Sequence, residues 1–267
     1  MITLKSSREI ELMRRSGKIT STVLTALMKA VRPGISTSEL DGMAEEQIRR
    51  AGGEPTFKGY NGFPASICAS VNDEVVHGIP GSRVLREGDL LSIDIGTTLE
   101  GYVSDSAVTV AVGTISPQAQ RLLDVTQECL TIGIAQMECG KRLGDIGAAI
   151  QAHAESHGYG VVRELVGHGV GRSMHEEPQV PNYGEYGTGM ELRAGLVLAI
   201  EPMITQGGPR IRILNDGWTV VTADGKLAAH FEHTIAVTKD GPKILTLRDY
   251  AERPEIERYR PARAAIA

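Results

Sequence analysis

Four carboxylates and one histidine are the residues of this sequence best suited to metal chemistry. They occur in strand-like or glycine-rich segments, in the order Asp94, Asp105, His168, Glu201 and Glu232. Three of the four carboxylates lie in or beside apolar, β-branched runs, where an uncompensated charge is costly to bury. Buried carboxylates need cations or protons, and four of them with one imidazole can hold two divalent ions. The set therefore predicts a dinuclear metallohydrolase.

Two of these acids lie on a predicted β-hairpin. Asp94 is in LLSIDIG and Asp105 follows in GYVSDSA, within a segment from 89 to 112 that indicates two strands around Leu99-Glu100-Gly101. A turn near Leu99-Glu100 would make the two aspartates close cross-strand neighbours. Like charges at that distance repel unless cations lie between them. Taken alone, Asp105 fits a solvated aspartate on the turn side better than a ligand.

The other three candidates come from separate segments. Glu201 follows the apolar run GLVLAI, where a structural salt bridge is the alternative interpretation. Glu232 stands between two histidines in AHFEHTIAV, and strand alternation would direct it away from Phe231 and His233. His168, in the glycine-rich VGHGVG, is expected on a loop, where a lone histidine is more often structural than a ligand. The joint occurrence of all five favours the ligand interpretation.

Other catalytic motifs fail on inspection. His175 and Glu176 begin like a zinc-protease HExxH helix, but Pro178 interrupts it and Gln179 replaces the second histidine. GHGVGR lacks the glycine spacing of a dinucleotide-binding loop, and the sequence holds no GxSxG or P-loop motif. A carboxylate-dominated site with one histidine favours Mn, Fe, Co, Zn or Mg over copper and does not choose among them.

Charge and composition exclude several classes of protein. A net charge of −5 gives no support for a DNA or anionic-membrane partner, and no apolar run reaches the roughly 18 residues of a spanning helix. The first 15 residues are charged and lack the apolar segment of a secretory signal. Three cysteines, Cys68, Cys129 and Cys139, are odd in number and form no CxxC pair. We therefore expect a globular protein of the reducing cytoplasm.

Four helices and two strand-rich regions must position these residues. Capping boxes open the first two helices, Ser6 with Glu9 and Ser36 with Glu39, and Ser116-Pro117 opens the third. The fourth is predicted from about 143 to 157. Strand-like runs follow from about residue 66 and again from about 161 to 247. The charged segment from Arg248 onward is expected on the surface.

The order of elements repeats along the chain. Gly34 to Gly52 and Gly140 to Gly158 are both helical spans ending in glycine. Asp94 and Glu201 each follow apolar strand residues, and they are 107 positions apart, nearly the 106 positions that separate the two helical spans. The fragments HGIP and HEEP, which contain His77 and His175, share an HxxP form. A single site between two related halves would follow from such a duplication, although matches this sparse also arise by chance.

At these residues the chain resembles the pita-bread metallopeptidases, and within them the type I methionine aminopeptidases. The likeness runs from the first helix to about residue 247, through NDEVVHGIP, the aspartate pair, GHGVGRSMHEEPQVPNY, IEPM and FEHTIAVT. It implies an α+β, pseudo-twofold fold with a curved antiparallel sheet and outer helices. Residues 1–250 would form one catalytic domain, with 251–267 as a charged C-terminal tail.

The resemblance also implies a role for each site residue. The site would hold two divalent ions, of Co, Mn, Fe, Zn or Mg. Asp94 would bind one ion and His168 with Glu201 the other, while Asp105 and Glu232 would bridge them. The family's two catalytic histidine positions fall on His77 and His175, and Glu201 is our candidate for moving a proton to the leaving amine. Pocket-lining positions fall on Tyr60, Phe63, Cys68, His77, Met174, His175 and Trp218. Asn61 departs from the family, which commonly has histidine there.

By this resemblance the protein is an exopeptidase that removes the initiator methionine when the second residue is small. Its partners would be N-terminal methionyl peptides and nascent chains, with transient ribosome contact, no DNA, no membrane and a monomeric state. Xaa-Pro aminopeptidases and prolidases are the enzymatic alternative, but they generally add a large N-terminal domain, for which the early catalytic pattern leaves no room. An inactive pita-bread binding module is the other alternative, but such relatives lose metal ligands.

Overall fold

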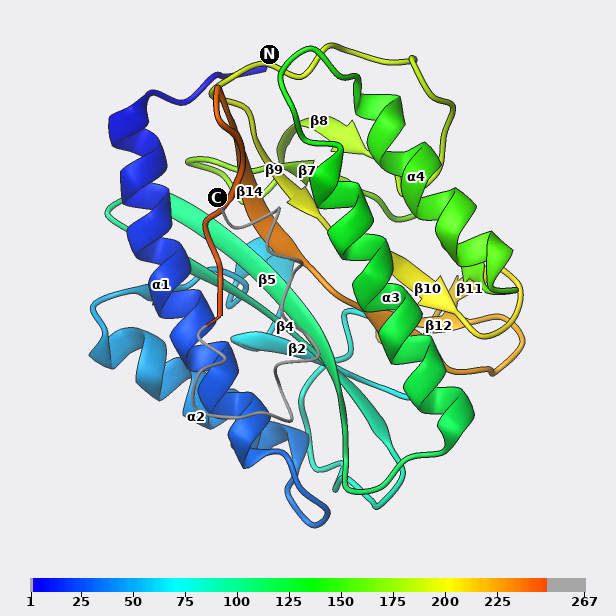
Figure 1. The fold of residues 1–267 in the computed structure, drawn as a ribbon. Coiled ribbons are helices and arrows are strands. Elements are labelled where there is room, and N and C mark those ends of the chain that lie inside the picture. Colours follow the sequence, from blue (N-terminus) through cyan, green and yellow to red (C-terminus); the bar gives the residue numbers. More distant parts are fainter. Residues whose placement is uncertain (1, 249–267) are drawn as a thin grey trace.

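Four helices lie on the outer side of antiparallel strands in the computed structural model, which describes residues 2–248 (Figure 1). The helices are α1 (Ser7–Ala30), α2 (Thr37–Arg50), α3 (Pro117–Ala135) and α4 (Leu143–Ser156). Both predicted capping boxes are confirmed, since Ser6 and Ser36 exchange hydrogen bonds with Glu9 and Glu39. Ser116 caps α3, which begins with proline as predicted. Among the described residues, no helix is long and apolar enough to cross a membrane.

Fifteen strands and one short 3-10 helix, η1 (Tyr60–Gly62), complete the described chain. The strands are β1 (Glu54–Pro55), β2 (Ile67–Val71), β3 (Glu74–Val76), β4 (Leu90–Leu99), β5 (Tyr102–Ala111), β6 (Gly160–Val161), β7 (Gly167–Gly169), β8 (Glu176–Val180), β9 (Val197–Ile200), β10 (Met203–Thr205), β11 (Ile211–Ile213), β12 (Val220–Thr222), β13 (Ala228–His230), β14 (His233–Thr238) and β15 (Gly241–Ile244).

Two larger sheets carry the core. In one, β4 lies between β2 and β5, with β1 at the end of β4; in the other the order is β15-β14-β9-β7-β8. Helices α1 and α2 pack against the first sheet, while α3 contacts β9, β10 and β13, and α4 contacts β6 and β8. The apolar faces of these helices and strands form one large buried cluster, which includes Leu24, Ile93, Leu130, Ile150 and Phe231.

Helices α2 and α4 reproduce the repeat expected from the sequence. Each has 14 residues, and α4 begins 106 positions after α2. Each helix also follows a longer helix and precedes a set of antiparallel strands. Each half of the chain thus contributes a helix pair and a sheet, as the predicted pseudo-twofold arrangement requires.

The hairpin β4–β5 sets the spacing of the two aspartates. Asp94 pairs with Ala107 and Asp105 with Gly96, so the aspartates are diagonal neighbours on one face and not directly opposed. The difference from expectation comes from the turn, which is Glu100-Gly101, with φ of 52° and 75°. Positive φ at both central residues is the hairpin geometry that glycine favours. The turn lies one residue later than a turn centred on Leu99-Glu100.

Two further sequence-based expectations were wrong. His168 lies in strand β7 and not on a loop, because Gly167 and Gly169 let neighbouring backbone approach: a Cβ on either would lie 2.4 Å from a carbonyl oxygen. Arg248 is 2% exposed and not on the surface. It donates a hydrogen bond to Ser106 Oγ at 3.1 Å and lies 3.4 Å from His233 Nε2. The predicted tail, 251–267, lies outside the described residues.

We expect Gly101→Ala to lower the free energy of unfolding by about 1–2 kcal/mol, because a Cβ is disfavoured in the left-handed region. Gly42→Ala is the matched control, since its Cβ would meet no atom within 4 Å inside α2. Alanine in a helix interior is more favourable than glycine by about 1 kcal/mol, so the control should be more stable than the wild type. Urea unfolding of the two variants measures both. Equal free energies of unfolding for Gly101→Ala and Gly42→Ala would contradict the assignment of the turn to Glu100-Gly101.

Candidate active site

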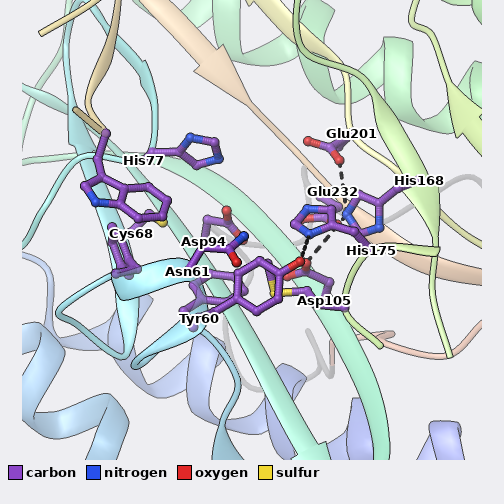
Figure 2. Close-up of a pocket in the computed structure, with 14 residues that line it drawn as sticks. Tyr60, Asn61, Cys68, His77, Asp94, Asp105, His168, His175, Glu201 and Glu232 are labelled. Carbon is purple, nitrogen blue, oxygen red and sulfur yellow. Dashed lines mark hydrogen bonds and ion pairs between the residues drawn. The ribbon is translucent and has the colours of Figure 1, made fainter. Parts of the chain in front are cut away.

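All twelve residues predicted for the site line one pocket (Figure 2). The set comprises the acids and His168, the two candidate catalytic histidines, and the predicted apolar wall: Asp94, Asp105, His168, Glu201, Glu232, His77, His175, Tyr60, Phe63, Cys68, Met174 and Trp218. Phe57, which the sequence interpretation missed, also lines the pocket. Asn61, noted in the sequence as a departure from the family, lines it too. The segments contributing to the pocket lie far apart in sequence, and tertiary packing alone brings them together.

The five predicted ligands converge at one end of this pocket. His168 Nε2 lies 3.5 Å from Glu201 Oε1 and 3.9 Å from Asp105 Oδ2. Asp105, His168 and Glu232 each offer a ligand atom within 4.8 Å of the others. Asp105 is 4% exposed and Glu232 is 2% exposed, which rules out a solvated turn-side aspartate at Asp105. Atoms this close can share the same ion.

The tautomer of His168 suits a ligand. Its Nδ1 is 3.0 Å from the carbonyl oxygen of Gly169 and must donate to it, since a carbonyl only accepts. The proton is then on Nδ1, which leaves the lone pair of Nε2 directed toward Glu201 and Asp105. A backbone acceptor on the second ring nitrogen is how metal-binding histidines are commonly oriented.

Unpaired oxygens in the cluster fit divalent cations. Asp94 Oδ1, Asp105 Oδ1 and Glu232 Oε1 are buried and have no hydrogen-bond partner among the described residues. Buried polar atoms are nearly always satisfied, so three orphaned carboxylate oxygens in one place call for an explanation. Hard divalent ions take carboxylate oxygens and an imidazole as ligands. The donor set therefore fits the ions that the sequence predicted.

Crowding also changes the acidity of these groups. Burial raises the pKa of Asp94 well above its ordinary value, and the charges of Asp105 and Glu201 raise it further. Burial likewise raises the pKa of Glu201 and of Glu232, with a further contribution from Asp105 in each case. Without cations, the folded protein resists ionising all of these carboxyls together.

We expect Glu232→Gln to make the metal-free protein more stable at pH 8, by about 1–3 kcal/mol, because it removes a buried charge. A carboxyl whose pKa is raised on folding destabilises the fold at high pH, and this cost fades as the pH falls. The gain should therefore shrink between pH 8 and pH 5. Unfolding in chelator measures it, with the partly exposed Glu45→Gln as the control. A destabilised variant at pH 8 would contradict the argument.

Hydrogen bonds between the two sheets, most of them from side-chain hydroxyls to backbone, fix the positions of the acids. Thr234 Oγ1 accepts a hydrogen bond from the N–H of Asp105 at 2.9 Å and donates one to its carbonyl oxygen at 2.7 Å. Ser106 Oγ donates to the carbonyl oxygen of Glu232 at 2.8 Å, and the N–H of Glu232 donates to Ala107. These bonds join β5 to β14 beside the cluster, so the acids of the two halves are held in register.

His230 is a further residue that the sequence interpretation did not assign to the site. It is 1% exposed, and its Nε2 lies 3.5 Å from Glu201 Oε2. Neither ring nitrogen has a hydrogen-bond partner within residues 2–248. Burial lowers the pKa of His230 to about 3, so the ring is neutral and carries one N–H. Its signal in the sequence was its place two residues before Glu232; in the structure it is the last residue of β13, and Glu232 lies between β13 and β14.

We expect His230→Leu to weaken divalent-metal binding by about 10–100-fold, the usual loss when a residue that orients a ligand is removed. His230→Gln should retain most of the affinity, because its amide supplies an N–H near Glu201. Competition with a fluorescent chelator measures the affinities, and thermal unfolding in chelator checks that both variants fold. Wild-type affinity in the leucine variant would show that His230 only fills space.

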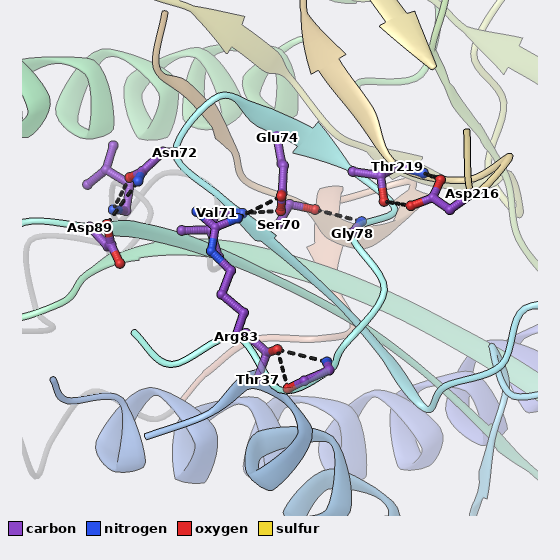
Figure 3. A network of polar contacts seen from close by, with 12 residues as sticks. Thr37, Ser70, Val71, Asn72, Glu74, Gly78, Arg83, Asp89, Asp216 and Thr219 are labelled. Carbon is purple, nitrogen blue, oxygen red and sulfur yellow. Dashed lines mark hydrogen bonds and ion pairs between the residues drawn. The ribbon is translucent and has the colours of Figure 1, made fainter. Parts of the chain in front are cut away.

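Side-chain caps fix the backbone next to His77 and Trp218; Figure 3 shows the bonds of Ser70 to Gly78 and of Asp216 to Thr219. His77 has φ of 60°, which is uncommon for a residue with a Cβ, and Ser70 Oγ accepts a hydrogen bond from the next N–H, that of Gly78. Asp216 accepts bonds from the N–H groups of Trp218 and Thr219 at 2.9 and 2.8 Å. The two rings then meet edge to face, with centroids 6.4 Å apart.

A second set of contacts presents His175. Glu176 accepts hydrogen bonds from the N–H groups of Arg172 and Ser173 and pairs with Lys5 Nζ at 2.7 Å. The Lys5 side chain is 5% exposed, so the chain's N-terminal segment anchors this loop. Nδ1 of His175 lies 2.8 Å from the hydroxyl of Tyr60. Because this side of His175 is engaged, its Nε2 is left for the pocket.

The rest of the pocket is apolar. Phe57, Phe63 and Cys68 form a buried cluster against which Met174 and Trp218 pack. Phe63 and Trp218 meet at 5.1 Å in an edge-to-face arrangement. Asn61 lines the same pocket in a left-handed conformation, with φ of 48°. An apolar recess beside a polar cluster suits a substrate that joins a hydrophobic side chain to a reactive amide.

Comparisons with known proteins agree with this arrangement. Residues 11–239 match the model of metallopeptidase family M24. The chain is 53% identical over 247 residues to the methionine aminopeptidase of Clostridium perfringens, covering 92% of this chain and 99% of that protein. It is 54% identical over 246 residues to methionine aminopeptidase 1 of Bacillus subtilis, again covering 92% and 99%.

Solved structures show the same relation. Methionine aminopeptidase from Thermotoga maritima superposes with a TM-score of 0.91 at 44% identity, covering 93% of this chain and 100% of that one. Prolidase from Pyrococcus furiosus superposes with a TM-score of 0.76 at 21% identity, covering 92% of this chain and 66% of that one. The second likeness concerns the fold alone.

Proposed function

The chain belongs to metallopeptidase family M24, and on that premise we propose that it removes N-terminal methionine from peptides and nascent chains. The predicted fold class, α+β with pita-bread pseudo-twofold symmetry, is confirmed by the superpositions. The observation that carries the proposal is the single pocket in which the acid cluster adjoins an apolar recess. The relatives named methionine aminopeptidase, matched over nearly their whole length, support the choice of substrate.

The acid cluster would hold two divalent ions. Asp94 would bind one ion, His168 and Glu201 the other, and Asp105 and Glu232 would contribute oxygens to both. The ions are Co, Mn, Fe, Zn or Mg, since the ligands are hard oxygens with one borderline nitrogen. When bound, such ions polarise the scissile carbonyl and increase the acidity of the attacking water.

The histidines act on the substrate in this proposal. Burial lowers the pKa of His175, so the ring is neutral near pH 7. The Tyr60 hydroxyl lies 2.8 Å from Nδ1. In this proposal the hydroxyl donates to Nδ1, so that the proton is on Nε2 and can be donated to the carbonyl oxygen as negative charge develops there. Burial lowers the pKa of His77 to about 4, which leaves a neutral ring to contact the scissile amide nitrogen.

Glu201 is the proposed proton carrier. Burial, followed by the charge of Asp105, raises its pKa well above the ordinary value for a glutamate. That shift belongs to the metal-free protein; in the proposal a Glu201 carboxylate oxygen accepts a proton from the attacking water and passes it to the leaving amine. His230 Nε2 lies 3.5 Å from Oε2 of this carboxyl.

The apolar recess would select the first residue. Tyr60, Phe63, Cys68, Met174 and Trp218 offer aromatic faces and two sulfurs, which suit an unbranched thioether. Small second residues such as Gly, Ala or Ser are preferred in this proposal. In the same proposal, residues 1–250 form one catalytic domain. The protein is a cytoplasmic monomer that contacts the ribosome transiently, and it has no DNA or membrane partner.

We expect metal-free protein to be inactive and added Mn or Co to restore cleavage of Met-Ala-Ser. Values of kcat/KM for Met-Ala-Ser, Met-Lys-Ser and Ala-Pro-Ser then test selectivity, and the first should be largest. Leucine in place of methionine should cost about 1–3 kcal/mol, the limit for similar apolar side chains. Preference for the proline peptide would identify a prolidase-like enzyme, and full activity in chelator would refute the metal mechanism.

We expect His175→Ala to lower kcat by about 10²–10³-fold, as loss of one oxyanion donor does elsewhere. Its metal stoichiometry should stay at the wild-type value, because the proposal places His175 on the substrate. Elemental analysis beside steady-state kinetics separates the two effects. Loss of metal in this variant would place His175 among the ligands instead.

A further inference from the structure

A second group of metal-ligating side chains lies outside the pocket, on α3 and α4. Within residues 2–248, ligand atoms of three or more such residues come together in two places: the pocket, and the group Glu128, His153 and His157. Of the seven histidines, four lie in or beside the pocket, and His233 is buried against Thr246 and Arg248. The remaining two, His153 and His157, are four residues apart at the end of α4.

The two histidines are arranged as a ligand pair. Residues four apart on a helix lie on one face, and here the ring centroids are 4.5 Å apart. His157 Nδ1 lies 2.9 Å from the carbonyl oxygen of His153 and must donate to it, with Ser156 Oγ at 3.4 Å. The proton is therefore on Nδ1, and the lone pair of His157 Nε2 is available.

The third member comes from the neighbouring helix. Glu128 on α3 places Oε2 at 2.8 Å from His153 Nε2, so the carboxylate is already held beside the histidine pair. The side chains of His153 and Glu128 are 21% and 46% exposed, which gives an ion access from solvent. A metal here would replace the proton that the two groups now share.

The end of α4 also favours a cation. The helix ends at Ser156 with His157 as its C-cap, so its last carbonyl groups place partial negative charge beside both rings. Glu128 adds a full negative charge from α3. The types of ligand, their spacing and the negative local potential therefore all favour a bound cation.

We propose that Glu128, His153 and His157 form a surface metal site that binds Zn²⁺ and similar late divalent ions. Two imidazole nitrogens and one carboxylate oxygen match the three protein ligands of open zinc sites, with water in the fourth position. Such nitrogen-rich sets discriminate against Mg²⁺ and Ca²⁺, which prefer oxygen ligands. An ion at this site would connect α3 to α4 and be counted in addition to the ions of the pocket.

The test is a Zn²⁺ titration of the metal-free full chain against a chromogenic chelator. The double variant His153→Gln/His157→Gln should bind one equivalent fewer than the wild type, whatever number the pocket holds. Glu128→Gln should weaken that equivalent by at least about tenfold, since even outer-shell changes cost about 10–100-fold. Glu155→Gln is the matched control: an acid on the same helix, in an ion pair with Arg163 at 3.7 Å.

Thermal unfolding gives a second readout. Zn²⁺ beyond that needed by the pocket should raise the melting temperature of the wild type and of Glu155→Gln, but not that of the double variant. Mg²⁺ should produce no such difference. Equal zinc equivalents and equal melting shifts in the wild type and the double variant would overturn the proposal. Loss of the equivalent in Glu155→Gln would also overturn it. Neither measurement depends on whether the pocket hydrolyses methionyl peptides.

Discussion

The packing of four carboxylates, two buried and two partly buried, into one small volume is the constraint on which the rest of this structure depends. Their oxygens are close enough to repel, several have no hydrogen-bond partner among the described residues, and burial raises their pKa values. A sequence that keeps such a cluster pays in folding free energy unless cations neutralise it. The one ligand histidine fits the same logic, because its tautomer leaves a lone pair for an ion and adds no charge. The arrangement of the site therefore requires bound cations, whatever reaction takes place there.

The cluster also lies where the two halves of the chain meet. Asp94 and Asp105 come from the hairpin β4–β5, whereas Glu201 and Glu232 come from the second half, beside β9 and β14. Thr234 and the backbone near Asp105 join the two sheets at this line. Ions bound there would tie one half to the other, so metal binding and the stability of the interface are coupled. The close approach of the carboxylates makes them repel one another, and it also lets them share the cations that would neutralise them.

Local signals in the sequence were enough for the helices, the long hairpin and the five acid and histidine positions of the cluster. Capping boxes and a leading proline act over a few residues, and they are confirmed where they were predicted. The wrong expectations for His168 and Arg248 share a cause, which is that tertiary contacts decide the positions of these residues. The three-residue strand β7 has no periodicity to reveal it, and only packing against β8 and β9 makes His168 part of a sheet. Arg248 follows the last strand with a charged sequence around it, yet the hydroxyl of Ser106, far away in sequence, holds it inside. The hairpin turn shifted by one residue because positive φ favours Gly101.

The pocket has two parts with different structural origins. The acids lie on or beside strands of the two sheets, held by hydrogen bonds between strands. The apolar wall stands mainly on connecting segments: η1 presents Tyr60, the segment before β8 presents Met174, and the turn before β12 presents Trp218. Each segment is fixed by its own cap, such as Asp216 beneath Trp218. Loops tolerate substitution far better than sheets do. Substrate preference can therefore change through positions such as Asn61 while the acid cluster, and with it the reaction, stays as it is.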